Sequence, residues 1–170
     1  SGPDLSVRVS ADAKRLLFME QRTIAHLWTA DIDGHNAREL TFDDQNLLEP
    51  SFSPDGSSIC FQMQSADLLR PGSHVFIIQS DGSRRTQLTA GEGRHYNPCW
   101  SPDGRYILYG SRGIGEPADS SRFYLVEASN PSTPKLVVKG VGAFWIDKET
   151  FVTGFTIPDV HGAVYSIHNT

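Results

Sequence analysis

The stretch Pro50-Ser51-Phe52-Ser53-Pro54-Asp55-Gly56 recurs as Pro98-Cys99-Trp100-Ser101-Pro102-Asp103-Gly104, so that Ser53 and Ser101 lie 48 residues apart. Weaker copies of the same motif begin at Ser10 and at Trp145. Internal repeats of about 40 to 50 residues are typical of propeller blades or solenoid units. The chain is therefore expected to contain four copies of one structural unit.

Each copy of the motif is followed by a short segment rich in aromatic and β-branched residues, which is typical of a strand. These segments are residues 27–30, 75–78, 123–126 and 164–167. In the first three units a tight-turn pair follows, and a return strand then ends the unit at 38–41, 87–89 or 135–138. Together with the strands on either side of the motif, this predicts four antiparallel strands in each unit.

The second strand of each unit is apolar on both faces. One face carries Leu16, Ile59, Ile107 and Val152, and the other carries Leu17, Cys60, Leu108 and Thr153. A sheet needs apolar side chains on both faces when it is packed between two neighbours. Radial stacking of four-stranded sheets produces a β-propeller, so the predicted fold class is all-β.

Two further expectations follow from this fold class. Strands should dominate, with no helix longer than a turn or two, because no window shows a sustained period of 3.6 residues. The large aromatic side chains should be buried between the sheets; they are Trp28, Phe52, Phe61, Phe76, Trp100, Tyr109 and Trp145.

These landmarks, in register over about residues 7–167, resemble the TolB-like, WD-repeat-like β-propeller repeat. The resemblance implies blades at approximately 5–41, 42–89, 90–139 and 140–170. Similar proteins usually carry six or more blades, so the resemblance implies that this chain is part of a larger ring. The start Ser1-Gly2-Pro3, without Met, is also expected of a piece of a longer protein.

Two other assemblies remain open: a dimer of two half-rings and a closed four-bladed ring. Half-rings would expose apolar blade faces, and self-association through those faces is then expected.

The charge balance argues against a nucleic-acid partner, because the net charge is -5 and the isoelectric point is near 5.6. The longest apolar run, Val75–Ile78, is far shorter than the ~20 residues of a membrane helix, so no membrane insertion is expected. No signal segment is expected in the opening residues, because they contain no basic stretch followed by an apolar run. The family resemblance implies a periplasmic or other extracytoplasmic location.

Metals, cofactors and disulfides are not expected. No His or Cys pair has the spacing of zinc ligands, and the loop that begins at Asp31 lacks the glutamate of a calcium loop. Cys60 and Cys99 are expected to be buried core thiols, with a bridge between them as the alternative. His26 and His74 share a repeat position, which predicts a shared structural role.

No catalytic residue is assigned. The chain lacks a serine-nucleophile elbow, a phosphate-binding loop and a zinc-protease motif. Asp55, Asp81 and Asp103 are explained by tight turns, because a short carboxylate accepts the backbone N–H groups that such turns leave free.

The longest insertions, residues 65–73 and 111–121, fall between the second and third strands. In a propeller these loops lie on the same rim as the links between blades, and insertions confined to one face often mark the binding face. The predicted partner-binding rim comprises Glu49, Arg70, His74, His95, Tyr96, Asn97, Arg112, Glu116, Asp119, Arg122 and His161.

The functional hypothesis is a non-enzymatic propeller module that binds a protein or peptide, as a scaffold or sensor. The resemblance implies one alternative, the propeller portion of a prolyl-oligopeptidase-type peptidase whose catalytic domain lies outside this chain. A second alternative is a propeller lyase or hydrolase, which would need acid and base groups clustered at the rim or axis.

Overall fold

A computed structural model describes residues 7–21, 24–67, 69, 71–140, 142–156 and 163–169 of the chain. It consists of short antiparallel strands joined by turns. The strands are β1 (Val7–Val9), β2 (Arg15–Gln21), β3 (Ala25–Asp31), β4 (Arg38–Glu39), β5 (Leu47–Phe52), β6 (Ser58–Gln64), β7 (Ser73–Gln79), β8 (Thr86–Gln87), β9 (Arg94–Trp100), β10 (Tyr106–Arg112), β11 (Arg122–Glu127), β12 (Asn130–Lys139), β13 (Gly142–Trp145), β14 (Thr150–Thr156) and β15 (Ala163–Asn169). A 3-10 turn, η1 (Ala118–Ser120), is the single helical element in these ranges.

The strands form four antiparallel units that follow the repeat. Strands β1–β4 form the first sheet, and β13–β15 form the last, with three strands described. The second unit (β5–β8) and the third (β9–β12) are linked into one eight-stranded sheet by a single parallel bridge, Ser73 to Arg94. The predicted all-β propeller architecture and the near absence of helix are confirmed.

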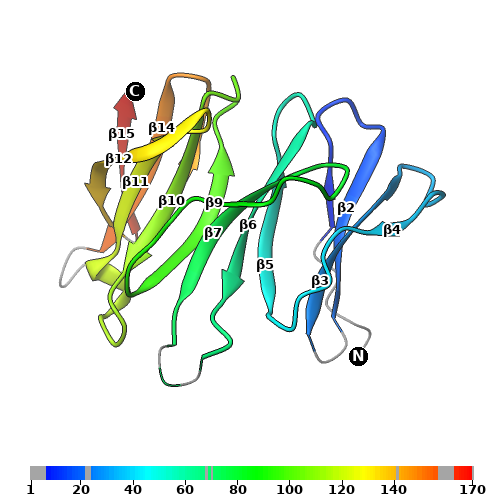
Figure 1. The fold of residues 1–170 in the computed structure, drawn as a ribbon. Coiled ribbons are helices and arrows are strands. Elements are labelled where there is room, and N and C mark those ends of the chain that lie inside the picture. The colour runs from blue at the N-terminus through cyan, green and yellow to red at the C-terminus, as the bar shows by residue number, and fades with distance from the viewer. Residues whose placement is uncertain are drawn as a thin grey trace.

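The units stand in a row with their faces toward one another, as Figure 1 shows. The first unit (blue) and the last unit (orange and red) lie at opposite ends of the row. No strand pairing joins these two end units within the described ranges. This part of the chain therefore forms an open arc of blades.

A repeated serine–aspartate contact shapes the turn after the first strand of each of the first three units. Ser53 Oγ donates to Asp55 Oδ1 at 2.6 Å and accepts the N–H of Ser58 at 3.0 Å. Ser101 makes the same two contacts with Asp103 at 2.6 Å and with the N–H of Tyr106 at 2.9 Å. The motif therefore specifies a turn, as the sequence predicted for these aspartates.

Of the two degenerate copies, the first keeps the serine–aspartate contact and replaces the glycine, while the fourth unit uses an aspartate alone. Ser10 bonds Asp12 at 2.6 Å, and Ala13 takes the left-handed conformation (φ 56°) that Gly56 takes in the second unit. In the fourth unit Asp147 Oδ1 accepts the N–H groups of Glu149 and Thr150, both at 2.8 Å. The strands on either side of these turns stay paired in the same register, because a carboxylate still accepts hydrogen bonds within the turn.

Three apolar clusters fill the spaces between adjacent units. The first joins units one and two through residues such as Leu17, Leu27 and Phe61, each 0% exposed. The second joins units two and three around Ile107, and the third joins units three and four around Phe151. The expectation that second strands are buried on both faces is confirmed, except that Leu16, on the outer side of the first unit, is half-buried.

The expectation of buried aromatic side chains is right for four of the seven. Phe52, Phe61, Phe76 and Tyr109 are buried. The three tryptophans are only half-buried, although the indole N–H of each is buried without a hydrogen-bond partner. Trp28 is not buried between sheets as expected, because it stacks on Phe18 on the face of the first unit that has no neighbouring sheet.

Both end units present apolar side chains on their outer faces. Val7 and Val9 are 45% and 52% exposed on the first unit, and Phe144 and Ile167 are 52% and 71% exposed on the last. Cross-strand pairing places Val7 opposite Phe18, and it places Phe144 and Ile167 on either side of Val152. Self-association through these faces stays a prediction.

The two cysteines are free thiols. Cys60 is fully buried and its Sγ lies 3.6 Å from the carbonyl oxygen of Pro98, while Cys99 is half-buried. Burial raises the pKa of both thiols, that of Cys99 to about 12. The expectation of buried thiols is right for Cys60, whereas Cys99 is less buried than expected.

Replacing Phe61 by Ala should lower the free energy of unfolding by about 3 to 5 kcal/mol, because this side chain is 0% exposed and stacks on Phe76. Chemical denaturation measures the change. The control Phe42→Ala removes an aromatic ring that is 76% exposed and should stay within about 0.5 kcal/mol of the wild type. Equal effects of the two substitutions would contradict the stacked-sheet core.

Replacing Ser101 by Ala should cost about 1 to 3 kcal/mol of unfolding free energy, because the N–H of Tyr106 and the carboxylate of Asp103 both lose a partner. The control Ser132→Ala removes an exposed serine that bonds only Asn130, and it should change the stability by less than about 0.5 kcal/mol. A Ser101 variant as stable as the wild type would show that the turn does not depend on this contact.

Candidate functional site

Every unit has a turn edge and a loop edge. The turn edge carries the serine–aspartate turns, including residues 53–57 and 101–105. The loop edge carries the described parts of the connections from second to third strands, residues 65–67, 69, 71–72 and 113–121, and the link at residues 90–93. In Figure 1 the tight turns lie at the top and the β6–β7 and β10–β11 connections lie at the bottom.

The predicted rim residues lie closer to the strands than the sequence suggested. Glu49 was expected in a link between blades but lies inside β5, and His95, Tyr96 and Asn97 lie inside β9. His74 is the second residue of β7, Arg122 is the first residue of β11, and Arg112 is the last residue of β10. These first strands begin earlier than the sequence pattern indicated. Arg70 and His161 lie outside the described residues.

His74 and His95 stack on each other with ring centroids 5.4 Å apart, and the Tyr109 ring meets His95 edge-on. His95 is 9% exposed, and neither ring nitrogen has a hydrogen-bond partner. Burial, and secondarily the charge of His74, lowers the pKa of His95 to about 4. This histidine pair therefore lies neutral between the second and third units at neutral pH.

The shared role expected for His26 and His74 is wrong. His26 pairs with the carboxylate of Glu39. The corresponding position in the second unit is Gln87, whose amide donates to the carbonyl of Thr89 instead. His74 has no carboxylate to bond, so it contacts Thr89 Oγ1 at 3.4 Å and stacks on the next unit.

Glu49 and Asn97 occupy equivalent bulges in β5 and β9. Both have left-handed backbones, with φ of 52° and 50°, and each precedes a proline. The side-chain amide of Asn97 faces the carboxylate of Glu49, and it donates to that carboxylate when its nitrogen lies on that side. Partial burial of this carboxyl group raises the pKa of Glu49, although the residue as a whole is exposed.

Glu116 holds its own loop together. Its Oε2 accepts the N–H of Gly113 at 2.9 Å and pairs with Arg122 at 3.1 Å. These contacts lower the pKa of Glu116, the Gly113 N–H most of all. Asp119 is an exposed residue of η1. The described rim residues thus include the pairs His74–His95, Glu49–Asn97 and Glu116–Arg122, and Asp119 contacts none of them.

Tyr96 and Arg112 form the remaining pair. The guanidinium carbon of Arg112 lies 5.8 Å from the centre of the Tyr96 ring, and the Tyr96 hydroxyl donates to Ser121 Oγ. The ring fits because Gly110 has no side chain: a Cβ there would lie 2.5 Å from Tyr96 Cε2.

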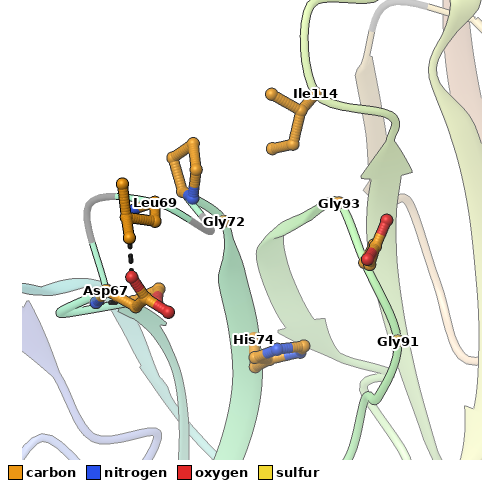
Figure 2. A pocket seen from close by; sticks show the side chains of 10 residues that line it. Asp67, Leu69, Gly72, His74, Gly91, Gly93 and Ile114 are labelled. Atoms are coloured by element: carbon orange, nitrogen blue, oxygen red, sulfur yellow. Dashed lines mark hydrogen bonds between the residues drawn. The ribbon is translucent and has the colours of Figure 1, made fainter.

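An open cavity of about 580 Å³ lies on the loop edge between the second and third units. Figure 2 shows His74 between the connection that carries Asp67 and Leu69 and the link that carries Gly91 and Gly93. Ile114 lies above them, from the β10–β11 connection. Leu69 is 93% exposed and Ile114 is 46% exposed. Of the predicted rim residues, His74 lines this cavity.

Two smaller hollows continue from this cavity toward the first strands. One, of about 240 Å³, shares Asp67, Pro71 and two further residues with the large cavity. The other, of about 230 Å³, shares Gln62 and Arg94 with the 240 Å³ hollow. It is also lined by Tyr96, Asn97 and Arg112. The sequence analysis missed Gln62 and Arg94. The available signal was a polar residue in the apolar strand β6.

No group of three or more potential metal ligands converges within the described residues. No described helix could span a membrane. Neither a protein-family model nor a curated protein matches the sequence.

Several solved structures share the fold. TolB from Acinetobacter baumannii is 20% identical over 97% of this chain and 40% of its own, with a TM-score of 0.71. Oligogalacturonate lyase from Vibrio parahaemolyticus is 17% identical over 100% of this chain and 53% of its own, with a TM-score of 0.70. A puromycin-hydrolyzing peptidase of Mycobacterium tuberculosis is 18% identical over 100% of this chain and 29% of its own, with a TM-score of 0.72.

The fold is that of the TolB-like β-propellers, as the sequence resemblance implied. The chain spans 40% of Acinetobacter baumannii TolB and 59% of a putative TolB from Agrobacterium tumefaciens. Proteins with this fold include TolB and enzymes of two different kinds.

Acidification should destabilise the protein through His95. Its pKa falls from 6.5 to about 4 on folding, so the unfolded chain binds more protons within that window and stability decreases as pH falls from 6.5 to about 4. The loss from this group is at most about 1.4 kcal/mol per pH unit. Denaturation of the wild type and His95→Phe at several pH values measures it.

The variant should lose less stability than the wild type in this window, while His35→Gln, which changes an exposed histidine, should behave as the wild type does. Identical pH profiles for His95→Phe and the wild type would show that His95 does not titrate in this way.

Proposed function

We propose that this propeller binds a protein or peptide partner at its loop edge and does not itself catalyse a reaction. The observation that supports this proposal most is the run of three adjoining hollows across the second and third units. The largest, at about 580 Å³, falls within the size range of ligand sites. Exposed apolar groups, Leu69 and Ile114, border it and would gain from burial by a partner.

The arrangement of charges supports the same proposal. On the turn edge, Asp55 and Asp103 accept hydrogen bonds from their serines, which lower the pKa of both and commit them to the turns. On the loop edge, Arg94, Gln62 and Asn97 line an open hollow. The loop edge therefore offers polar groups to a partner, whereas those of the turn edge are occupied.

One alternative has specific support. The fold is also found in an acylaminoacyl peptidase and a prolyl endopeptidase, of which the chain covers 31% and 24%. In this alternative the chain is the propeller portion of a larger peptidase, and peptides pass along the first strands, β5 and β9. Their binding would then depend on Glu49 and Asn97 more than on the loop edge.

An extracytoplasmic location is a further part of the proposal. It is supported by the structural likeness to the two TolB proteins.

A random-peptide display library selected on the immobilised protein tests the function. Selected peptides should bind Leu69→Asp/Ile114→Asp about tenfold or more weakly than the wild type, because a carboxylate would replace each apolar contact. The control Ile32→Asp changes an apolar residue in the β3–β4 turn whose exposure, 50%, is close to the 46% of Ile114, and it should leave binding unchanged.

Failure to select any peptide, or selected peptides that respond to Ile32→Asp and not to the loop-edge variant, would contradict the proposal. Peptides that respond to Glu49→Gln and Asn97→Ala alone would favour the peptidase alternative.

A further inference from the structure

Two arginines on the loop edge face each other without a carboxylate. Arg94 of β9 and Arg112 of β10 are directly paired across the strands. Like charges in this position repel each other. Elsewhere in the described chain, Arg85 pairs with Asp43 and Arg122 pairs with Glu116, but no described carboxylate lies within ion-pair distance of Arg94 or Arg112.

The Arg112 guanidinium has an aromatic ring beside it. It lies against the Tyr96 ring, which is itself fixed by the space over Gly110 and by the hydroxyl contact with Ser121. Such a contact favours one side-chain position, which reduces the entropy lost when the cation binds an anion. A planar guanidinium also presents paired donors that match the two oxygens of a carboxylate.

Gln62 adds a neutral hydrogen-bonding group beside the arginines. The residue is 8% exposed as a whole, and it lines both of the smaller hollows, each together with Arg94. Its side-chain amide is not among the described buried polar groups that lack a partner, so it carries no unpaired-group penalty. A side-chain amide both donates and accepts hydrogen bonds, as a peptide group does, so a peptide in these hollows can bond to it.

We infer that the loop edge binds an acidic peptide segment, with a carboxylate between Arg94 and Arg112 and the peptide backbone bonded to Gln62. This inference rests on the proposed function and names the class of partner. The adjoining cavity, with Leu69 and Ile114, then receives an apolar side chain of the same peptide. Leu69 and Ile114 favour a peptide over an acidic saccharide, because a saccharide has no apolar side chain to pack on them. Asp67 and Glu92 also line this cavity, so the carboxylate of the peptide lies at the arginines and not there.

Fluorescence anisotropy with labelled octapeptides tests the inference. One peptide contains leucine, alanine and glutamate, and its partner carries glutamine at every glutamate position. The wild type should bind the glutamate peptide about tenfold or more tightly than the glutamine peptide. Raising the salt concentration should weaken binding of the glutamate peptide only.

In Arg94→Gln/Arg112→Gln the preference for glutamate should vanish, and in Arg94→Lys/Arg112→Lys part of it should return. The control Arg84→Gln/Arg105→Gln removes the same charge from the turn edge, including an arginine over an aromatic ring, Tyr106. It should keep the full preference. Thermal melting confirms that each variant is folded, and single substitutions replace any double variant that is not.

The outcomes separate this inference from the proposed function. Library peptides that depend on Leu69 and Ile114 but show no acidic preference overturn the acidic-partner inference and leave the function standing. Equal binding of the glutamate and glutamine peptides, or displacement of the glutamate peptide by a uronic-acid oligosaccharide at lower concentration than by unlabelled peptide, also overturns it. If Arg84→Gln/Arg105→Gln lost the preference for the glutamate peptide, the anion would bind away from Arg94 and Arg112, and the inference would be overturned as well.

Discussion

The structure depends on sheets that are apolar on both faces. A four-stranded sheet such as β5–β8 carries Phe61 toward one neighbour and Cys60 toward the other, and both side chains are fully buried. Burial of this kind stabilises the fold only if another sheet covers each face. Stacking is therefore required by the side chains, and the open arc of blades follows from it.

Stacking also determines where function can reside. Successive antiparallel strands bring all serine–aspartate turns to one edge and all longer connections to the other. The turns are short and internally bonded, so they have little freedom to vary. The connections carry fewer constraints, and the spaces between them become the three hollows. The cross-strand arginine pair lies where the strands β9 and β10 meet this edge.

Much of the fold could be predicted from the repeat alone. The motif at Ser53 and Ser101 gave the turns correctly, because its hydrogen bonds are local and involve residues two to five positions apart. The tryptophans were less predictable, since their burial depends on whether a neighbouring sheet covers them. Trp28 shows this most clearly, because its side of the first unit is uncovered.

The candidate site was only partly accessible to sequence reasoning. The rim was placed on the loop edge because insertions are visible as length differences. The stacking of His74 on His95 depends on how two units approach each other. The pairing of Arg94 with Arg112 depends on strand register. No residue type specifies either feature. Gln62 was missed because a single polar residue within a strand gives no indication of whether it lines a hollow between two units.

Amide hydrogen exchange on the wild-type protein, with and without the glutamate octapeptide, tests the central claim most directly. The account predicts slower exchange on binding within residues 90–94 and 111–121, with no change at residues 53–57 and 101–105. Protection at the turn edge, or on the outer faces of the end units around Val9 and Phe144, would contradict the assignment of the binding site to the loop edge.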